Sequence, residues 1–112
     1  MNDGFAPLPE PPYYAVIFTS QLTADHAGYD QMAQAMAALA ARQPGYIGAE
    51  SVRGADGRGI TVSYWKDEDS IKAWKEQAEH LGAQTLGKQR WYGQYSLRVA
   101  RVERAYTGPQ GR

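Results

Sequence analysis

The sequence predicts an α+β fold in which two helices cover one face of a four-stranded antiparallel sheet. Segments rich in β-branched and aromatic residues, typical of strands, occur at 13–20, 46–53, 59–65 and 91–106. Apolar residues recur with helical spacing between the first and second of these segments, and again between the third and fourth. The resulting order, strand, helix, strand, strand, helix, strand, is the ferredoxin-like arrangement.

Length and composition indicate one small globular domain. A chain of 112 residues fits a single domain, which we place at 13–106. Lys and Arg number 12, as do Asp and Glu, so we expect no nucleic-acid partner, because phosphate binding needs basic surface. Without cysteine there is no thiolate metal site, and His26 and His80 are far apart, so we expect no metal. No signal-peptide pattern or membrane-length apolar run occurs, and we expect a cytoplasmic protein that does not contact a membrane.

The two ends of the chain differ from its centre. Residues 1–12 contain four prolines and are predicted to form an extended or disordered arm, which would also suit contact with a partner subunit. Residues 107–112 are a short tail. The strand at 13–20 is apolar on both faces, so both faces of the sheet need cover. The helices cover one face, and a second copy in a homodimer is the simplest cover for the other.

The first helix is expected to begin at a cap formed by Thr23 or Asp25 and to end at Gln43, before a Pro-Gly pair. Met32 and Met36 lie on its apolar stripe, and we interpret them as core residues. After this helix, Asp-Gly between the strands at 46–53 and 59–65 predicts an antiparallel hairpin.

The second hairpin strand has two different faces. One is apolar, whereas the other carries Thr61 and Ser63 until it reaches Trp65. Small polar side chains leave room for a ligand or a second sheet. The strand leads into a helix capped by Asp67, and residues 79–90 are expected to form a second, offset helix. The final strand is longer than the sheet needs, so we expect it to reach a partner subunit.

Aromatic residues between 61 and 95 are the candidates for substrate binding. Two interpretations stay open for the tryptophans, since large aromatic side chains line pockets but also fill cores. Trp91 begins the last strand, where it would close the same pocket or the dimer interface. The candidate substrate-binding residues are Tyr64, Trp65, Trp74, Trp91 and Tyr95.

Two ionisable residues are the candidates for catalysis. His80 has an ordinary pKa of about 6.5, so it is a candidate base, although a lone helical histidine beside Glu79 is also a common packing residue. Arg98 is a candidate cationic donor to an oxyanion. The alternative for Arg98 is an ion pair with a carboxylate such as Glu50 or Glu103.

Several motifs resemble one known family. Over residues 13–106, and above all in its Trp-rich segments, the chain resembles the antibiotic biosynthesis monooxygenase family of dimeric α+β barrels. The matching segments are residues 43–48, 61–65, 67–69, Trp74, 79–80, 91–92 and 101–104. The resemblance implies a dimeric α+β barrel and an oxygenase that needs no metal or flavin cofactor. Such enzymes deprotonate a phenolic polycycle held between helices and sheet, and the carbanion then reduces O₂.

Two other functions are weighed against this one. Haem degradation, known in a related branch, is disfavoured because the position of its iron-binding histidine, ten residues after Trp74, is Gln84 here. The first strand also lacks that branch's asparagine. A dimer that binds a small aromatic ligand without catalysis is the remaining alternative, and it would need only an apolar cavity.

Overall fold

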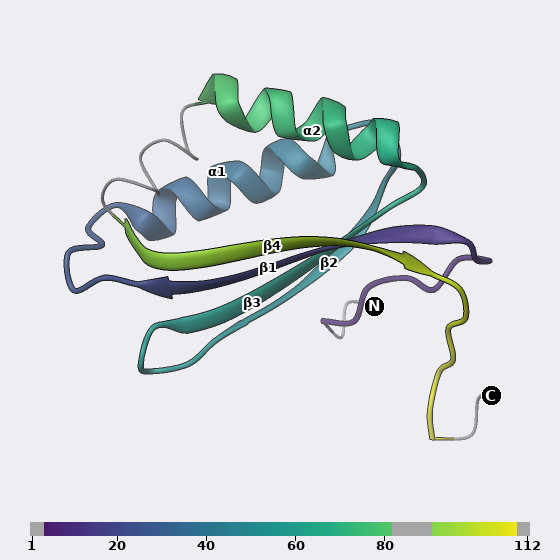
Figure 1. Ribbon diagram of the computed structural model, residues 1–112, viewed down its shortest axis with the longest axis horizontal. Coiled ribbons are helices and arrows are strands. Elements are labelled where there is room, and N and C mark those ends of the chain that lie inside the picture. Colours follow the sequence, from purple (N-terminus) through teal and green to yellow (C-terminus); the bar gives the residue numbers. More distant parts are fainter. Residues whose placement is uncertain (1–3, 82–90, 110–112) are drawn as a thin grey trace.

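The computed structural model describes residues 4–81 and 91–109 and confirms the predicted α+β fold. Its elements are β1 (Tyr13–Leu22), α1 (Tyr29–Ala41), β2 (Tyr46–Arg53), β3 (Arg58–Trp65), α2 (Glu68–Leu81) and β4 (Tyr92–Val102). Figure 1 shows both helices on one face of a single twisted sheet. The ferredoxin-like order predicted from the sequence is therefore present.

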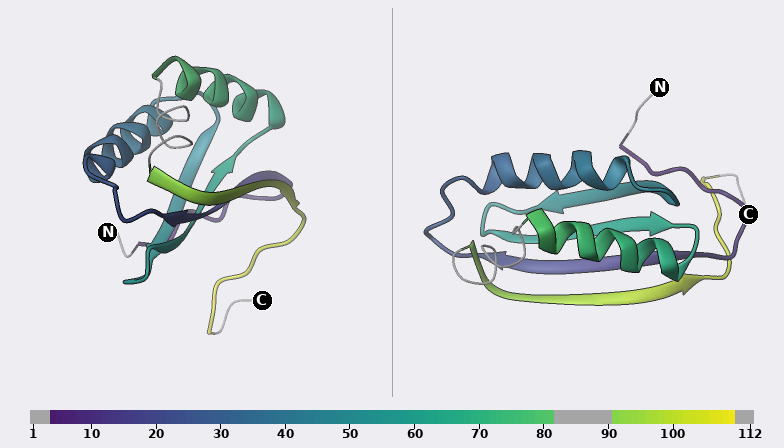
Figure 2. Two further views of the ribbon diagram at one scale, coloured as in Figure 1. Left: turned by 60° about the vertical axis from the view of Figure 1, so that its left-hand side comes forward. Right: turned by 90° about the horizontal axis from the view of Figure 1, so that it is seen from above.

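The strands pair antiparallel in the order β2-β3-β1-β4. Viewed from above in Figure 2, α1 lies over the β2 side of the sheet and α2 lies over β3 and β1, while β4 forms an edge beyond both helices. The side chains of β4 that face the helix side are consequently well exposed, for example Leu97 at 45% and Val99 at 47%. The helix layer therefore leaves the β4 edge of the sheet open.

The hydrophobic core lies where β3 ends. Trp65 is 0% exposed and packs with Val16 of β1 and Ala40 of α1. Its indole stacks on Trp74 of α2 at a centroid distance of 6.0 Å, and its Nε1 donates to Ser63 Oγ at 2.9 Å. One tryptophan thus joins both helices to the sheet.

The two helices begin differently. Asp67 caps α2 as predicted, because its Oδ1 accepts the Ser70 backbone N–H at 2.8 Å. The predicted start of α1 at Thr23 or Asp25 is wrong. The Thr23 hydroxyl instead donates to the Asp25 carbonyl within a turn, and α1 begins after Gly28, which has φ of +86°. A left-handed glycine directs the chain into the helix without a side-chain cap.

The N-terminal arm lies against the face of the sheet opposite the helices. The Ala6 N–H donates to Glu50 Oε2 at 2.9 Å, and a Cβ on Gly48 would come within 2.8 Å of Pro7. The predicted final strand is too long, since β4 ends at Val102. The predicted helix at 79–90 falls largely outside the described residues, apart from 79–81, which belong to α2. No helix in the described part of the chain is long and apolar enough to cross a membrane.

Candidate functional site

The helix-facing side of the sheet is organised in rows across the strands. Because Trp65 and Val16 contact α1, the residues two, four and six positions away from them along each strand also face the helices. The row farthest from Trp65 runs across β2, β3, β1 and β4 and consists of Arg53, Gly59, Ser20 and Tyr95. The sheet therefore places a charged side chain beside the start of α1.

Arg53 is held by several protein oxygens. Its Nη2 donates to Ser20 Oγ at 2.8 Å and to Tyr29 Oη at 3.1 Å. Its Nη1 donates to the Gly57 carbonyl at 2.5 Å and to the Ser20 carbonyl at 3.5 Å. The guanidinium carbon also lies 5.2 Å from the centre of the Tyr29 ring, within cation–π range. These contacts fix the guanidinium between the sheet and α1.

An aromatic group surrounds this arginine. Tyr29 packs edge-on against Trp91 at 5.7 Å and against Tyr92 at 5.8 Å between ring centres. Tyr92 also contacts Phe18 at 5.3 Å and Tyr95 at 6.0 Å. Flat rings from β1, α1 and β4 thus border the polar contacts of Arg53.

Tyr92 stays protonated well above neutral pH. Burial is the main cause that raises its pKa, and the hydrogen bond with the Tyr29 hydroxyl raises it further, while the positive charge of Arg53 acts in the opposite direction. A phenol with a raised pKa is a hydrogen-bond donor at physiological pH and not a base. The cluster can therefore stabilise negative charge on a bound oxygen, and any base must come from elsewhere.

Beyond this row, the helix-facing surface of the sheet carries small polar side chains, as the alternation in β3 predicted. Thr61 and Ser63 face the helices, and the Ser51 and Thr61 hydroxyls lie 2.7 Å apart. These short side chains leave more space under the helix layer than aliphatic residues would. Phe18, which pairs with Thr61, adds an apolar side chain to the same surface of the sheet.

The structure divides the predicted aromatic residues between two places. Trp65 and Trp74 stack in the core at one end, whereas Trp91 and Tyr95 belong to the aromatic group near Arg53. Trp65 lies six positions after Gly59 in β3, which corresponds to about 20 Å along the strand. A small ligand that contacts the Arg53 end would not touch Trp65.

Two other predicted residues lie on the opposite face of the sheet. Tyr64 donates to Glu50 Oε1 at 2.9 Å near the N-terminal arm, and burial, followed by this hydrogen bond, raises its pKa to about 12. Arg98 pairs in register with Ile17, is exposed, and donates to Ser96 Oγ at 3.4 Å. The predicted ion pairs of Arg98 are not among its contacts in the described structure. Glu103 instead pairs with Arg101 at 3.4 Å.

The His80 side chain lies outside the described residues, as does Gln84, so the structure does not place the predicted base. Within residues 4–79 and 91–109 no group of three His, Asp or Glu side chains is arranged to hold a metal ion.

Sequence reasoning missed Arg53, Ser20 and Tyr29 as site residues. The available signal was Gly59, because a glycine inside a strand often marks a close approach of another group. A Cβ on Gly59 would lie 2.5 Å from Arg53 Cζ, so the guanidinium occupies the space that a side chain would fill.

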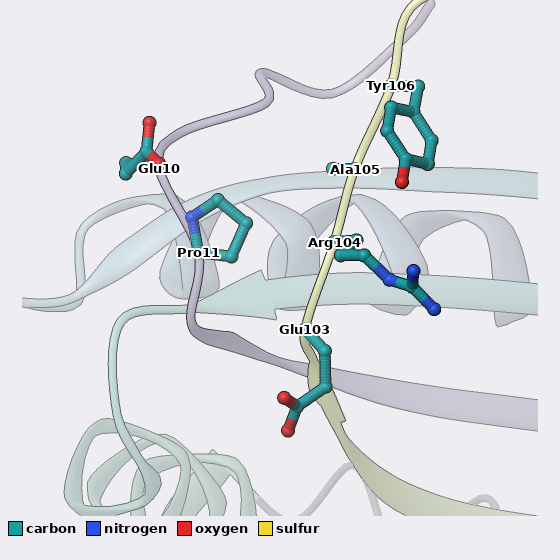
Figure 3. A pocket seen from close by; sticks show the side chains of 6 residues that line it. All are labelled: Glu10, Pro11, Glu103, Arg104, Ala105 and Tyr106. Atoms are coloured by element: carbon teal, nitrogen blue, oxygen red, sulfur yellow. The ribbon is translucent and has the colours of Figure 1, made fainter. Parts of the chain in front are cut away.

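A separate hollow of about 240 Å³ lies between the N-terminal arm and the segment after β4 (Figure 3). Its lining is formed by Glu10, Pro11, Glu103, Arg104, Ala105 and Tyr106. Tyr92 begins β4 and Val102 ends it, so this hollow is about 30 Å from the Arg53 cluster. It is open to solvent and has no connection with the helix-facing site.

Fold and site together define a class: a ferredoxin-like α+β protein with polar and aromatic side chains between helices and sheet. Residues 14–86 match the family model described as antibiotic biosynthesis monooxygenase. Over 104 residues the chain is 52% identical to the uncharacterized protein YqjZ of Bacillus subtilis (strain 168). The match covers 93% of this chain and 91% of that protein. The chain belongs to the antibiotic biosynthesis monooxygenase family.

Solved structures agree at the level of the fold. SnoaB, a cofactor-independent oxygenase from Streptomyces nogalater, superposes with a TM-score of 0.68 at 18% identity, covering 89% of this chain and 100% of that chain. A putative antibiotic biosynthesis monooxygenase from Nitrosomonas europaea gives 0.70 at 16% identity, covering 88% and 97%. At these identities the likeness concerns the fold alone.

Proposed function

We propose that this protein is a cofactor-independent monooxygenase that oxidises a small phenolic aromatic compound with O₂. The observation that supports it best is the cluster of Arg53, Tyr29 and Tyr92 beside aromatic rings on the helix-facing side of the sheet. Membership of the family is the second support. The aromatic rings suit a flat substrate, and the cationic hydrogen-bonding cluster suits an oxygen that gains negative charge.

The chemistry can be written for an anthrone, in which a ring CH₂ lies opposite a carbonyl. Loss of one proton gives a carbanion whose charge is delocalised onto the carbonyl oxygen, where Arg53 and the two tyrosines stabilise it. The carbanion reduces O₂, and a C–O bond forms to give a hydroperoxide. Loss of the second ring proton, with cleavage of the O–O bond, gives a quinone and water. His80 on α2 remains the candidate base predicted from the sequence.

We also propose that the protein works as a homodimer. The face of the sheet opposite the helices exposes apolar side chains, with Val52 at 69% and Ile60 at 46%. A second copy packed on this face would bury them. Sedimentation should give the mass of a dimer for the wild type and of a monomer for a variant with both Val52→Lys and Ile60→Lys, whereas Gln34→Lys on α1 should stay dimeric. A monomeric wild type would contradict the dimer.

The enzymatic proposal is tested by O₂ uptake with an anthrone and with naphthols and quinols, in buffer containing EDTA. We expect uptake above the uncatalysed rate and a product with one more oxygen and two fewer hydrogens. Arg53→Met should lose most of the rate, while Arg58→Met, which removes an exposed arginine at the start of β3, should keep it. If these compounds bind but none is oxidised, the protein is a ligand-binding dimer and not an oxygenase.

Arg53 and Arg98 give a direct comparison of two possible sites. They lie on opposite faces of the sheet. If the oxyanion forms on the helix-facing side, Arg53→Met lowers the rate far more than Arg98→Met. The reverse order would place the reaction on the other face.

A further inference from the structure

We propose that the hydroxyl of Tyr29 is the hydrogen-bond donor to the substrate oxygen, and that Arg53 and Gly59 are positioning residues that act through Tyr29. This inference rests on the proposed function. It assigns a separate role to each member of the cluster, and the roles follow from counting donors and acceptors.

The terminal N–H groups of Arg53 already have protein acceptors. A guanidinium has two hydrogens on each Nη. Those of Nη1 are directed at the Gly57 and Ser20 carbonyls, and those of Nη2 at Ser20 Oγ and Tyr29 Oη. A ligand oxygen would have to displace one of these acceptors to bind an Nη directly. The Nη groups of Arg53 therefore act on a ligand through a neighbour.

Tyr29 is the neighbour through which the positive charge of Arg53 can stabilise an oxygen of the ligand. A phenol has one hydrogen to donate and two lone pairs to accept with. Arg53 donates to Tyr29 Oη, so this oxygen already accepts one charge-assisted hydrogen bond. The hydrogen of the Tyr29 hydroxyl is then left to donate to the oxygen of a bound ligand. Accepting a hydrogen bond from a cation also strengthens the bond that a hydroxyl donates.

The position of Tyr29 suits a flat ligand. Its ring lies against Tyr92, and Tyr92 in turn contacts Phe18 and Tyr95. A ring held against Phe18 and Tyr95 would thus have the two hydroxyls at its edge. This arrangement selects a ligand with a phenolic or carbonyl oxygen at one edge of an aromatic system.

Gly59 makes the position of Arg53 possible. A Cβ at this residue would lie 2.5 Å from Arg53 Cζ and 2.8 Å from both Nη atoms. Real Cβ atoms do not approach so closely, so Gly59→Ala must displace the guanidinium. The displaced group is the end of a flexible side chain, so the variant should still fold. It separates Arg53 from Tyr29 without altering either residue.

Turnover of an anthrone provides the first test. We expect Tyr29→Phe to lower kcat by about 10²–10³, the usual loss on removing one oxyanion donor. Gly59→Ala and Arg53→Met should lower kcat by about tenfold, because each removes one charge-assisted hydrogen bond and leaves the donor in place. The matched controls are Gly93→Ala, whose new Cβ finds its nearest atom at 3.7 Å, and Tyr14→Phe at the far end of the sheet.

Binding of 4-nitrophenol provides a second test that needs no turnover. Bound to wild type, it should ionise at lower pH than in solution, because donors and positive charge favour the phenolate. Tyr29→Phe should abolish this absorbance shift and Gly59→Ala should reduce it, while both controls keep it. Wild-type kcat and a full shift in Tyr29→Phe would overturn the assignment. If wild type shows the shift but oxidises nothing, the oxygenase proposal fails and the role of Tyr29 as donor stands.

Discussion

Replacing Trp65 by alanine should lower the free energy of unfolding by about 4 kcal/mol. The side chain is 0% exposed. An aromatic side chain buries about 150–250 Å², and at about 25 cal/mol per Å² this area contributes about 4–6 kcal/mol. Alanine substitutions of buried Phe and Trp cost about 3–5 kcal/mol. The total free energy of unfolding of a domain of this kind is about 5–15 kcal/mol, so the variant should lose about a quarter or more of its stability.

Urea unfolding followed by far-UV circular dichroism measures this loss without relying on tryptophan fluorescence. Wild type and variants must be compared at one protein concentration, because dimerisation adds to apparent stability. Trp74→Ala is the matched control. Trp74 stacks on the Trp65 indole but is only partly buried. We therefore expect Trp74→Ala to lower the free energy of unfolding about half as much as Trp65→Ala does. A loss below about 1 kcal/mol for Trp65→Ala would mean that Trp65 lines a ligand cavity and not the core.

Three further predictions concern single residues at turns and on the opposite face of the sheet. Gly45→Ala should destabilise the fold by about 1 kcal/mol or more, since Gly45 has φ of +86° and a Cβ would meet Ser70 Oγ at 2.0 Å. Asp67→Ala should lower Tm at neutral pH, because hydrogen bonds from Ser70 lower the pKa of the Asp67 carboxyl below 3.8. The difference from wild type should shrink as the pH falls below that value. Tyr64 has a pKa of about 12 in the folded protein against 10.0 for an ordinary tyrosine. The contribution of Tyr64 to folding stability is therefore present below pH 10 and is lost as the pH rises towards 12. Tyr64→Phe should therefore lose less stability over that interval in alkaline unfolding.

The fold was predictable because local patterns and tertiary contacts agree along most of the chain. The segment at β1 is apolar on both faces, the segment at β3 alternates between an apolar and a small polar face, and Asp67 has both the position and the chemistry of a helix cap. The start of α1 was not predictable in the same way. Thr23 and Asp25 are good capping residues, but they bond to each other in a turn, and Gly28 takes over the change of direction. Cap signals compete locally, and the sequence does not say which one prevails.

The sequence indicated two aromatic residues that lie near Arg53, Trp91 and Tyr95, but not the polar centre of the candidate site. Tyr95 lies in the row of Arg53, whereas Arg98, the cation that the sequence suggests, lies three positions further along β4 and therefore on the opposite face of the sheet. Arg53 ends a strand before a turn, where an arginine usually points to water. Its contacts with Ser20 and Tyr29 span 33 and 24 residues of sequence, and only the register of three strands brings them together.

The most direct test of the central claim is the rate of O₂ uptake with an anthrone by wild type, Tyr29→Phe and Tyr14→Phe under identical conditions. Oxidation on the helix-facing side, with Tyr29 as donor, predicts rapid uptake by wild type and Tyr14→Phe. It also predicts a rate lower by about 10²–10³ for Tyr29→Phe. Equal rates in all three proteins, or no uptake by wild type above the uncatalysed reaction, would contradict it.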